Sequence, residues 1–181
     1  SELEKVLREI RRLLDEARKR NEEFLRRIEE LLRRNEEEVR RVLEKIERKV
    51  ERVKRDLERR RVPEEVVRDA ERRIDEIRRK IEEILERTKR DVERLLKELR
   101  DITRETERRV KELEDELSRV RREEKLERIL RTARKVVEDN ERLVREVLKK
   151  VKRVSDESRR LLEEIDREVD EVIKRLEERA K

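Results

Sequence analysis

The sequence predicts an all-α protein: an antiparallel, nearly untwisted three-helix bundle whose packing is similar to that of a coiled coil. Apolar residues recur at steps of three and four along the chain, which is the spacing of one helix face. The pattern follows an 18-residue repeat and loses its phase at two points that carry the charges typical of helix ends. Since 62% of the 181 residues are charged and 31% are apolar, we expect a thin core and a charged outer surface.

The first helix is expected over residues 1–60. Ile10, Ile28 and Ile46 occupy equivalent positions of the 18-residue repeat, whereas a heptad repeat fails at Glu38 and Lys45. Eighteen residues complete five turns at 3.6 residues per turn, so one face stays buried in a straight helix. A seven-residue repeat would impose a left-handed supercoil instead. The repeat therefore predicts helices that pack with almost no supercoil.

The second and third helices are expected over residues 63–120 and 124–180, with loops near 61–63 and 121–124. The same repeat aligns two further sets of residues: Ile74, Val92 and Val110 in the second helix, and Ile129, Val147 and Ile165 in the third. Pro63 suits a helix start, where no backbone N–H donor is needed. Because the chain contains no glycine, both turns must form without the residue that most easily adopts a left-handed conformation. We expect helices of about 57–60 residues at 1.5 Å per residue, in a single elongated bundle over residues 1–181.

The composition argues against several kinds of chemistry. The chain has no Cys, His or Gly, which removes disulfides, thiolate nucleophiles, Ser-His-Asp triads, ordinary zinc or haem ligation and phosphate-binding loops. Acids and bases alternate along each helix, as in the Glu22/Arg26 pair one turn apart. We therefore expect no enzyme activity, catalytic residue, cofactor or metal site.

The same charges bear on partners and location. Each cation has an acid about one turn away, so no clustered basic face is available and we expect no nucleic-acid partner. No apolar run approaches the length of a membrane-spanning helix, and we expect no membrane partner. The first residues, Ser1 to Glu4, lack the basic-then-apolar pattern of a signal peptide. We expect a soluble protein without a targeting signal, whose compartment is unknown.

Eleven uncharged polar residues of the Ser, Thr and Asn types carry the sharpest signal. Ser1, Ser118 and Thr132 are expected at an end or on the surface, and the other eight lie on the apolar stripes. In an antiparallel bundle, residues of the first and third helices share a height when their numbers differ by about 121. The eight residues then form two layers that each draw on all three helices: the first layer is Asn21, Thr103, Thr106 and Asn140, and the second layer is Asn35, Thr88, Ser155 and Ser158.

Two interpretations of these layers are open. A Ser or Thr at a core position often bonds a carbonyl of its own helix and needs no partner elsewhere. The coincidence of height across three helices favours two buried hydrogen-bond networks. An unpaired buried amide costs about 1–3 kcal/mol, so a slipped bundle would leave Asn21 and Asn35 unpaired among leucines and isoleucines. We therefore expect the layers to specify helix pairing and register.

The stripe, the Glu/Arg/Lys surface and the two layers together make the whole chain resemble a de novo designed, parametrically built helical bundle with buried hydrogen-bond networks. The resemblance implies a very stable, idealised structural scaffold with no evolved activity and no required partner. In a recombinant host it would stay in the cytoplasm. The chain departs from such designs in lacking glycine-containing loops. The alternative is an interaction module that forms a homo-oligomer or exchanges a helix with a partner, because the apolar stripe of the third helix is wide.

Overall fold

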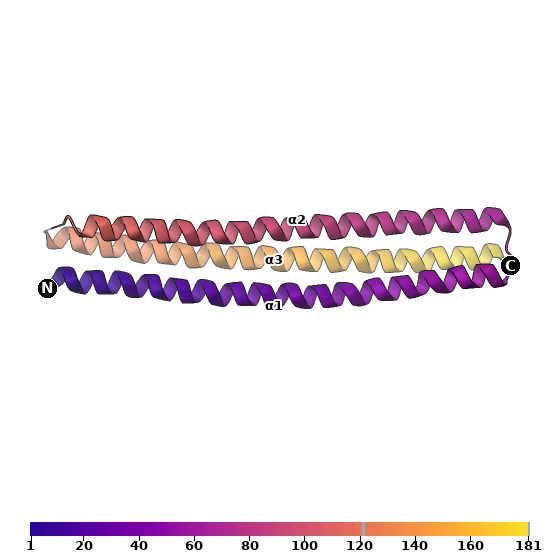
Figure 1. Ribbon diagram of the computed structural model, residues 1–181, viewed down its shortest axis with the longest axis horizontal. Helices are drawn as coiled ribbons and strands as arrows, with labels where there is room; N and C mark the ends of the chain where they lie inside the picture. The colour runs from indigo at the N-terminus through magenta and orange to yellow at the C-terminus, as the bar shows by residue number, and fades with distance from the viewer. Residues whose placement is uncertain (121, 181) are drawn as a thin grey trace. The chain divides into compact units, whose positions relative to one another are not determined.

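A computed structural model describes residues 1–120 and 122–180 of the chain. Within these residues it has three helices and no strand: α1 (Glu2–Arg59), α2 (Glu64–Leu117) and α3 (Glu123–Ala180) (Figure 1). The prediction of an all-α, three-helix bundle is confirmed. Arg121, in the predicted second loop, and Lys181, at the end of the predicted bundle, lie outside the described residues.

The helix ends lie close to the expected positions, and local hydrogen bonds explain the differences. The Pro63 carbonyl accepts hydrogen bonds from the Val66 and Val67 N–H groups at 3.0 and 3.3 Å, so α2 begins at Glu64. At its other end, α2 stops at Leu117 rather than near 120. The Val120 N–H donates to the Leu117 carbonyl over a shorter, three-residue span. That turn lets the half-buried Val120 pack on the neighbouring core.

The first loop makes its turn with an arginine in the position where helices commonly use glycine. Arg61 has a φ of 49° and is the one described residue with a positive φ. This left-handed conformation crowds the Cβ atom of any residue except glycine. The next residue, Val62, is half-buried and packs against Val53, Leu57 and the other apolar residues at this end of the bundle.

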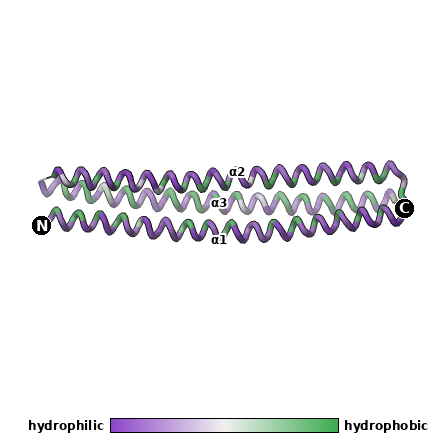
Figure 2. Tube along the Cα trace, viewed as in Figure 1, coloured by the Kyte–Doolittle hydropathy of each residue, from purple (hydrophilic) through white to green (hydrophobic). Residues whose placement is uncertain are grey.

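The chain divides into two compact units, and each helix contributes a segment to both. Unit 1 consists of Ser1–Glu30 and Glu93–Lys152, and unit 2 consists of Leu31–Val92 and Arg153–Lys181. Within each unit the three helical segments run side by side (Figure 1), and hydrophobic residues recur along every helix (Figure 2). The expectation of one continuous, untwisted body over the whole chain stays a prediction.

The core of unit 1 is built by all three helices. One cluster of its buried apolar residues contains Val6 and Ile10 of α1, Val110, Leu113 and Leu117 of α2, and Leu126, Ile129, Ala133 and Val136 of α3. In unit 2 the corresponding core contains Val39, Ile46 and Val50 of α1, Ile74 and Ile77 of α2, and Leu162, Ile165 and Val169 of α3. Equivalent positions of the repeat are buried alike, as Ile10, Ile28 and Ile46 show. The helical repeat seen in the sequence is therefore the repeat of the core.

Charged pairs between helices show how the helical segments of unit 1 are aligned. In unit 1, Glu98 of α2 pairs with Lys150 of α3, whereas Glu116, further along α2, pairs with Arg128, earlier in α3. Those two segments are therefore antiparallel. Arg20 of α1 pairs with Glu141 of α3, 121 residues later, which matches the expected offset between the first and third helices.

Candidate functional site

The first layer lies inside unit 1 and takes residues from all three helices. Asn21 comes from α1, Thr103 and Thr106 from α2, and Asn140 from α3. Asn21, Thr106 and Asn140 are buried, and Thr103 is half-buried. Each residue lies on the apolar stripe of its helix, so the packing that buries the neighbouring leucines and valines also buries these polar groups. The structure brings all four predicted residues together.

Hydrogen bonds join these four residues across the helices. The Asn21 Nδ2 donates to Asn140 Oδ1 at 3.2 Å, and the Asn140 Nδ2 donates back to Asn21 Oδ1 at 2.8 Å. The Thr106 hydroxyl donates to Asn140 Oδ1 at 2.9 Å, and Asn21 Nδ2 also donates to Thr103 Oγ1 at 3.4 Å. The Thr103 hydroxyl donates to the Leu99 carbonyl at 3.1 Å. Both amide oxygens and both amide nitrogens therefore have partners inside the bundle.

The residues of the first layer can position the helices, but they cannot carry out acid–base or nucleophilic chemistry. Amide and hydroxyl groups neither gain nor lose a proton near neutral pH, so these four residues supply no acid, base or activated nucleophile. They do supply directional bonds in a buried interior, where an unpaired polar group is costly. The arrangement can distinguish one alignment of the three helices from another.

The second layer lies inside unit 2 and differs from the first. Asn35, Ser155 and Ser158 are between 2% and 9% exposed, and Thr88 is half-buried. The Thr88 hydroxyl donates to the Ile84 carbonyl of its own helix at 2.7 Å, which is the local bond that the alternative interpretation describes. Asn35 Oδ1, Ser155 Oγ and Ser158 Oγ are buried without a hydrogen-bond partner. The structure buries Asn35, Ser155 and Ser158 but does not join these three atoms into a network.

A groove between α2 and α3 lies beside the second layer. Its volume is about 160 Å³, and its lining residues are Glu83, Ile84, Arg87, Thr88, Asp91, Val154, Glu157, Ser158 and Leu161. On this stretch of α2 the stripe residues Ile81, Ile84 and Leu85 are half-buried rather than buried. The second layer is therefore less enclosed on its α2 side than the first layer is.

Sequence reasoning missed a charged cluster between α1 and α3 in unit 2. The Lys49 ammonium lies 2.9 Å from Asp166 and 2.7 Å from Asp170, and Lys45 lies 3.3 Å from Asp166. The Asp166 side chain is only 13% exposed. The sequence does contain an indication of this cluster. Lys49 lies 18 residues, one full repeat, after Leu31, at a position of the repeat that is otherwise apolar.

Burial and ion pairing shift the pKa values of Asp166 and Lys49 in opposite directions. Burial raises the pKa of the Asp166 carboxyl, but hydrogen bonds from Lys49 and Lys45 outweigh it and hold the pKa below the ordinary aspartate value. Burial lowers the pKa of Lys49, and its hydrogen bonds to Asp170 and Asp166 more than reverse the effect. Both partners therefore stay charged over a wide pH range.

A second charged cluster joins α2 and α3 near the first loop. The Asp69 carboxylate lies 2.7 Å from Arg72, 3.3 Å from Arg73 and 2.6 Å from Arg179. The hydrogen bond from Arg72 is the largest of the effects that lower the pKa of Asp69. Arg179 is the one member of the cluster on α3, so its contact with Asp69 is the one that links the two helices.

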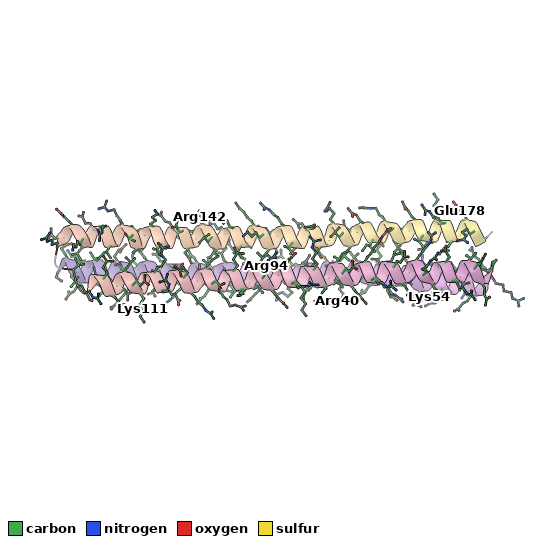
Figure 3. The ribbon with its side chains drawn as sticks, turned by 90° about the horizontal axis from the view of Figure 1, so that it is seen from above. Arg40, Lys54, Arg94, Lys111, Arg142 and Glu178 are labelled. Atoms are coloured by element: carbon green, nitrogen blue, oxygen red, sulfur yellow. The ribbon has the colours of Figure 1, made fainter. Side chains whose placement is uncertain are left out.

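Most of the remaining charged residues are exposed. Lys111 and Arg142 of unit 1 point away from the bundle, as does Arg40 of unit 2 (Figure 3). Among the described residues, no three acidic side chains are placed to hold a metal ion. Within that same part of the chain, none of the helices combines the length and apolar character that a membrane crossing requires.

Comparisons with known proteins return no relatives. No family model matches the chain, and neither a curated protein nor a solved structure matches it.

Proposed function

We propose that the chain is a designed structural scaffold without a natural biochemical function, whose buried polar layers specify helix pairing and register. The observation that carries this proposal is the reciprocal pair of amide hydrogen bonds between Asn21 and Asn140. Thr106 adds α2 to the pair through its bond to Asn140 Oδ1. The hydrogen bonds of Asn140 Oδ1 thus require all three helices to be correctly placed.

The selectivity of the first layer follows from geometry. A slip of one turn moves one helix by about 5.4 Å relative to its neighbour, which is far longer than any hydrogen bond can stretch. Both amides would then face apolar side chains. Each unsatisfied amide would cost about 1–3 kcal/mol, whereas a purely apolar stripe would tolerate the same slip with little penalty.

Interhelical ion pairs favour the same alignment. In unit 1, Arg20 pairs with Glu141, and in unit 2, Glu38 pairs with Arg159; in both cases the partners are 121 residues apart. Such exposed pairs are individually weak. Because the pairs repeat at one offset, they all favour the alignment that the Asn21–Asn140 bonds require.

The experiment compares the parent chain with Asn21→Leu/Thr106→Val/Asn140→Leu, which replaces the interhelical hydrogen bonds with apolar contacts. Light scattering coupled to gel filtration measures the mass of each. The proposal expects a parent mass of 22.7 kDa and a variant that keeps its helical circular dichroism but forms a mixture of species. A variant that remains one sharp monomer would count against a role in specificity. The exposed Thr132→Val is the matched control and should behave as the parent does.

A second candidate function is an interaction module, in which the chain forms a homo-oligomer or exchanges a helix with a partner. Leu3 and Leu25 of α1 favour it, because both are large apolar residues that remain 39% and 37% exposed. The mass measurement separates the two functions: a parent mass two or three times that of the chain would replace the scaffold with the oligomer.

A further inference from the structure

Three buried polar atoms in the second layer lack partners. They are Asn35 Oδ1 on α1, and Ser155 Oγ and Ser158 Oγ on α3. Buried polar groups in proteins are almost always hydrogen-bonded, either to the protein or to an ordered water molecule. Three such atoms in one layer therefore call for a specific partner.

The three atoms lie at the same height in unit 2. Glu38 of α1 bonds to Arg159 of α3, which sets an offset of 121 residues between the two helices. By the same offset, Asn35 lies level with the α3 turn that carries Ser155 and Ser158. The stripe positions of all three residues direct them towards the shared interior of the unit.

Water has the donors and acceptors that these atoms require. The Asn35 oxygen only accepts, while each serine hydroxyl donates one hydrogen bond and also accepts. A water molecule that donates to Asn35 Oδ1 and accepts from a serine hydroxyl satisfies both groups. Buried water molecules in proteins typically make two to four such bonds.

The groove between α2 and α3 provides a route for this water. Ser158 and Thr88 line it, together with charged residues that include Glu83, Arg87 and Glu157. Its volume of about 160 Å³ exceeds the roughly 30 Å³ that one water molecule occupies in the liquid. We propose that ordered water binds in the second layer, entering through this groove, and links Asn35 to Ser155 and Ser158.

The first layer provides the contrast within the same chain. Asn21 and Asn140 bond to each other, and Thr103 and Thr106 supply further bonds. Their amides have protein partners and need no water. The proposal therefore predicts one dry layer in unit 1 and one hydrated layer in unit 2.

A competing arrangement involves no water at the serines. Their hydroxyls would rotate to bond carbonyls of α3, as the Thr88 hydroxyl bonds Ile84 on α2. That rotation provides no hydrogen-bond donor for Asn35 Oδ1, which accepts and cannot donate. The hydration state of the Asn35 amide therefore distinguishes the two arrangements.

The composition of the chain makes this measurement direct. The sequence contains three asparagines and no glutamine, so an ¹⁵N-labelled sample gives three side-chain amide groups in its spectrum. Water contacts at each are read from paired NOE and ROE experiments near pH 5, where amide proton exchange is slow. Opposite signs in the two experiments mark a bound water, and equal signs mark proton exchange or brief surface contact.

We expect a bound-water signal at Asn35 and none at Asn21 or Asn140. The absence of the signal at Asn35, or its presence at all three amides, would overturn the proposal. In Ser155→Ala/Ser158→Ala the water loses its α3 partners, so the Asn35 signal should lose most of its intensity. An undiminished signal there would contradict the proposed link. The exposed Ser118→Ala is the matched control and should leave the signal unchanged.

Discussion

The side-chain amides of Asn21 on α1 and Asn140 on α3 hydrogen-bond to each other in both directions, at 3.2 and 2.8 Å. Without the Asn140 Nδ2 donor, Asn21 Oδ1 would be unpaired in the interior of unit 1, and without Asn21 Oδ1 the Asn140 Nδ2 donor would be unpaired there. Such a pair is sensitive to alignment in a way that leucines and valines are not, because a hydrogen bond depends on both distance and direction.

The reciprocal pair predicts strong coupling between its two positions. Asn140→Leu alone leaves the Asn21 amide buried without its α3 partner, and we expect a loss of about 1–3 kcal/mol in the free energy of unfolding. Asn21→Leu/Asn140→Leu removes both amides and should cost less than the two single substitutions combined. Guanidinium unfolding of the four proteins measures the coupling energy. Strict additivity would show that the two amides act independently.

The first loop predicts a stabilising substitution. Arg61 has a φ of 49°, a conformation that costs a non-glycine residue about 1–2 kcal/mol. Arg61→Gly removes this strain but adds freedom to the unfolded chain, so we expect a net gain of about 0.5–1 kcal/mol. Arg61→Val should be destabilising, because a β-branched side chain fits this conformation poorly. The same unfolding measurement checks both, and a loss of stability in the glycine variant would rule out strain at this turn.

The cluster around Asp166 predicts a specific response to acid. Its pKa is lower in the folded protein than the ordinary value, so its contribution is complete above the unfolded pKa of about 3.9. The contribution is lost as the pH falls through the lower, folded pKa. We therefore expect the parent to lose stability between about pH 5 and pH 2 more steeply than Asp166→Asn does. The exposed Asp101→Asn is the control, and equal slopes for the parent and Asp166→Asn would contradict the prediction.

The burial pattern of α1 predicts unequal costs for two neighbouring residues. Ile28 is fully buried, whereas Leu25, one turn earlier, is 37% exposed. Ile28→Ala should lower the free energy of unfolding by about 2–4 kcal/mol, because it leaves a cavity in the packed interior. Leu25→Ala should cost about 1 kcal/mol or less. A larger loss at Leu25 would indicate that another chain covers this residue, as in the oligomer.

Much of the fold was predictable because one periodicity governs the whole sequence. The 18-residue repeat identifies Ile10, Ile28 and Ile46 as equivalent positions, and all three are buried. The helix ends were less predictable. The end of α2 at Leu117 depends on how Val120 packs after the turn, and no local pattern specifies that packing.

The polar layers, too, were predictable only in part. Height along the helices correctly placed Asn21 level with Asn140, since position depends only on rise per residue. Height alone does not determine side-chain orientation, so it did not reveal that the Thr88 hydroxyl bonds its own helix at Ile84. The charged cluster at Lys49 depends on ion pairs between α1 and α3, and charge spacing along one helix predicts only the pairs within that helix.

The register of α1 and α3 within unit 1 can be measured directly with a pair of spin labels. The chain has no cysteine, so Arg11→Cys/Lys149→Cys provides two unique, exposed sites for spin labels. With partners 121 residues apart, the two sites are separated by about 25 Å along the helix axis. Pulsed electron paramagnetic resonance then gives the distribution of label distances.

If the first layer specifies the register, the otherwise unaltered chain gives one narrow distribution of label distances. In the background of Asn21→Leu/Thr106→Val/Asn140→Leu it predicts a broad or split distribution, with components displaced by about 5 Å for each turn of slip. The same narrow distribution in both backgrounds would contradict the claim that the first layer specifies the register of the helices.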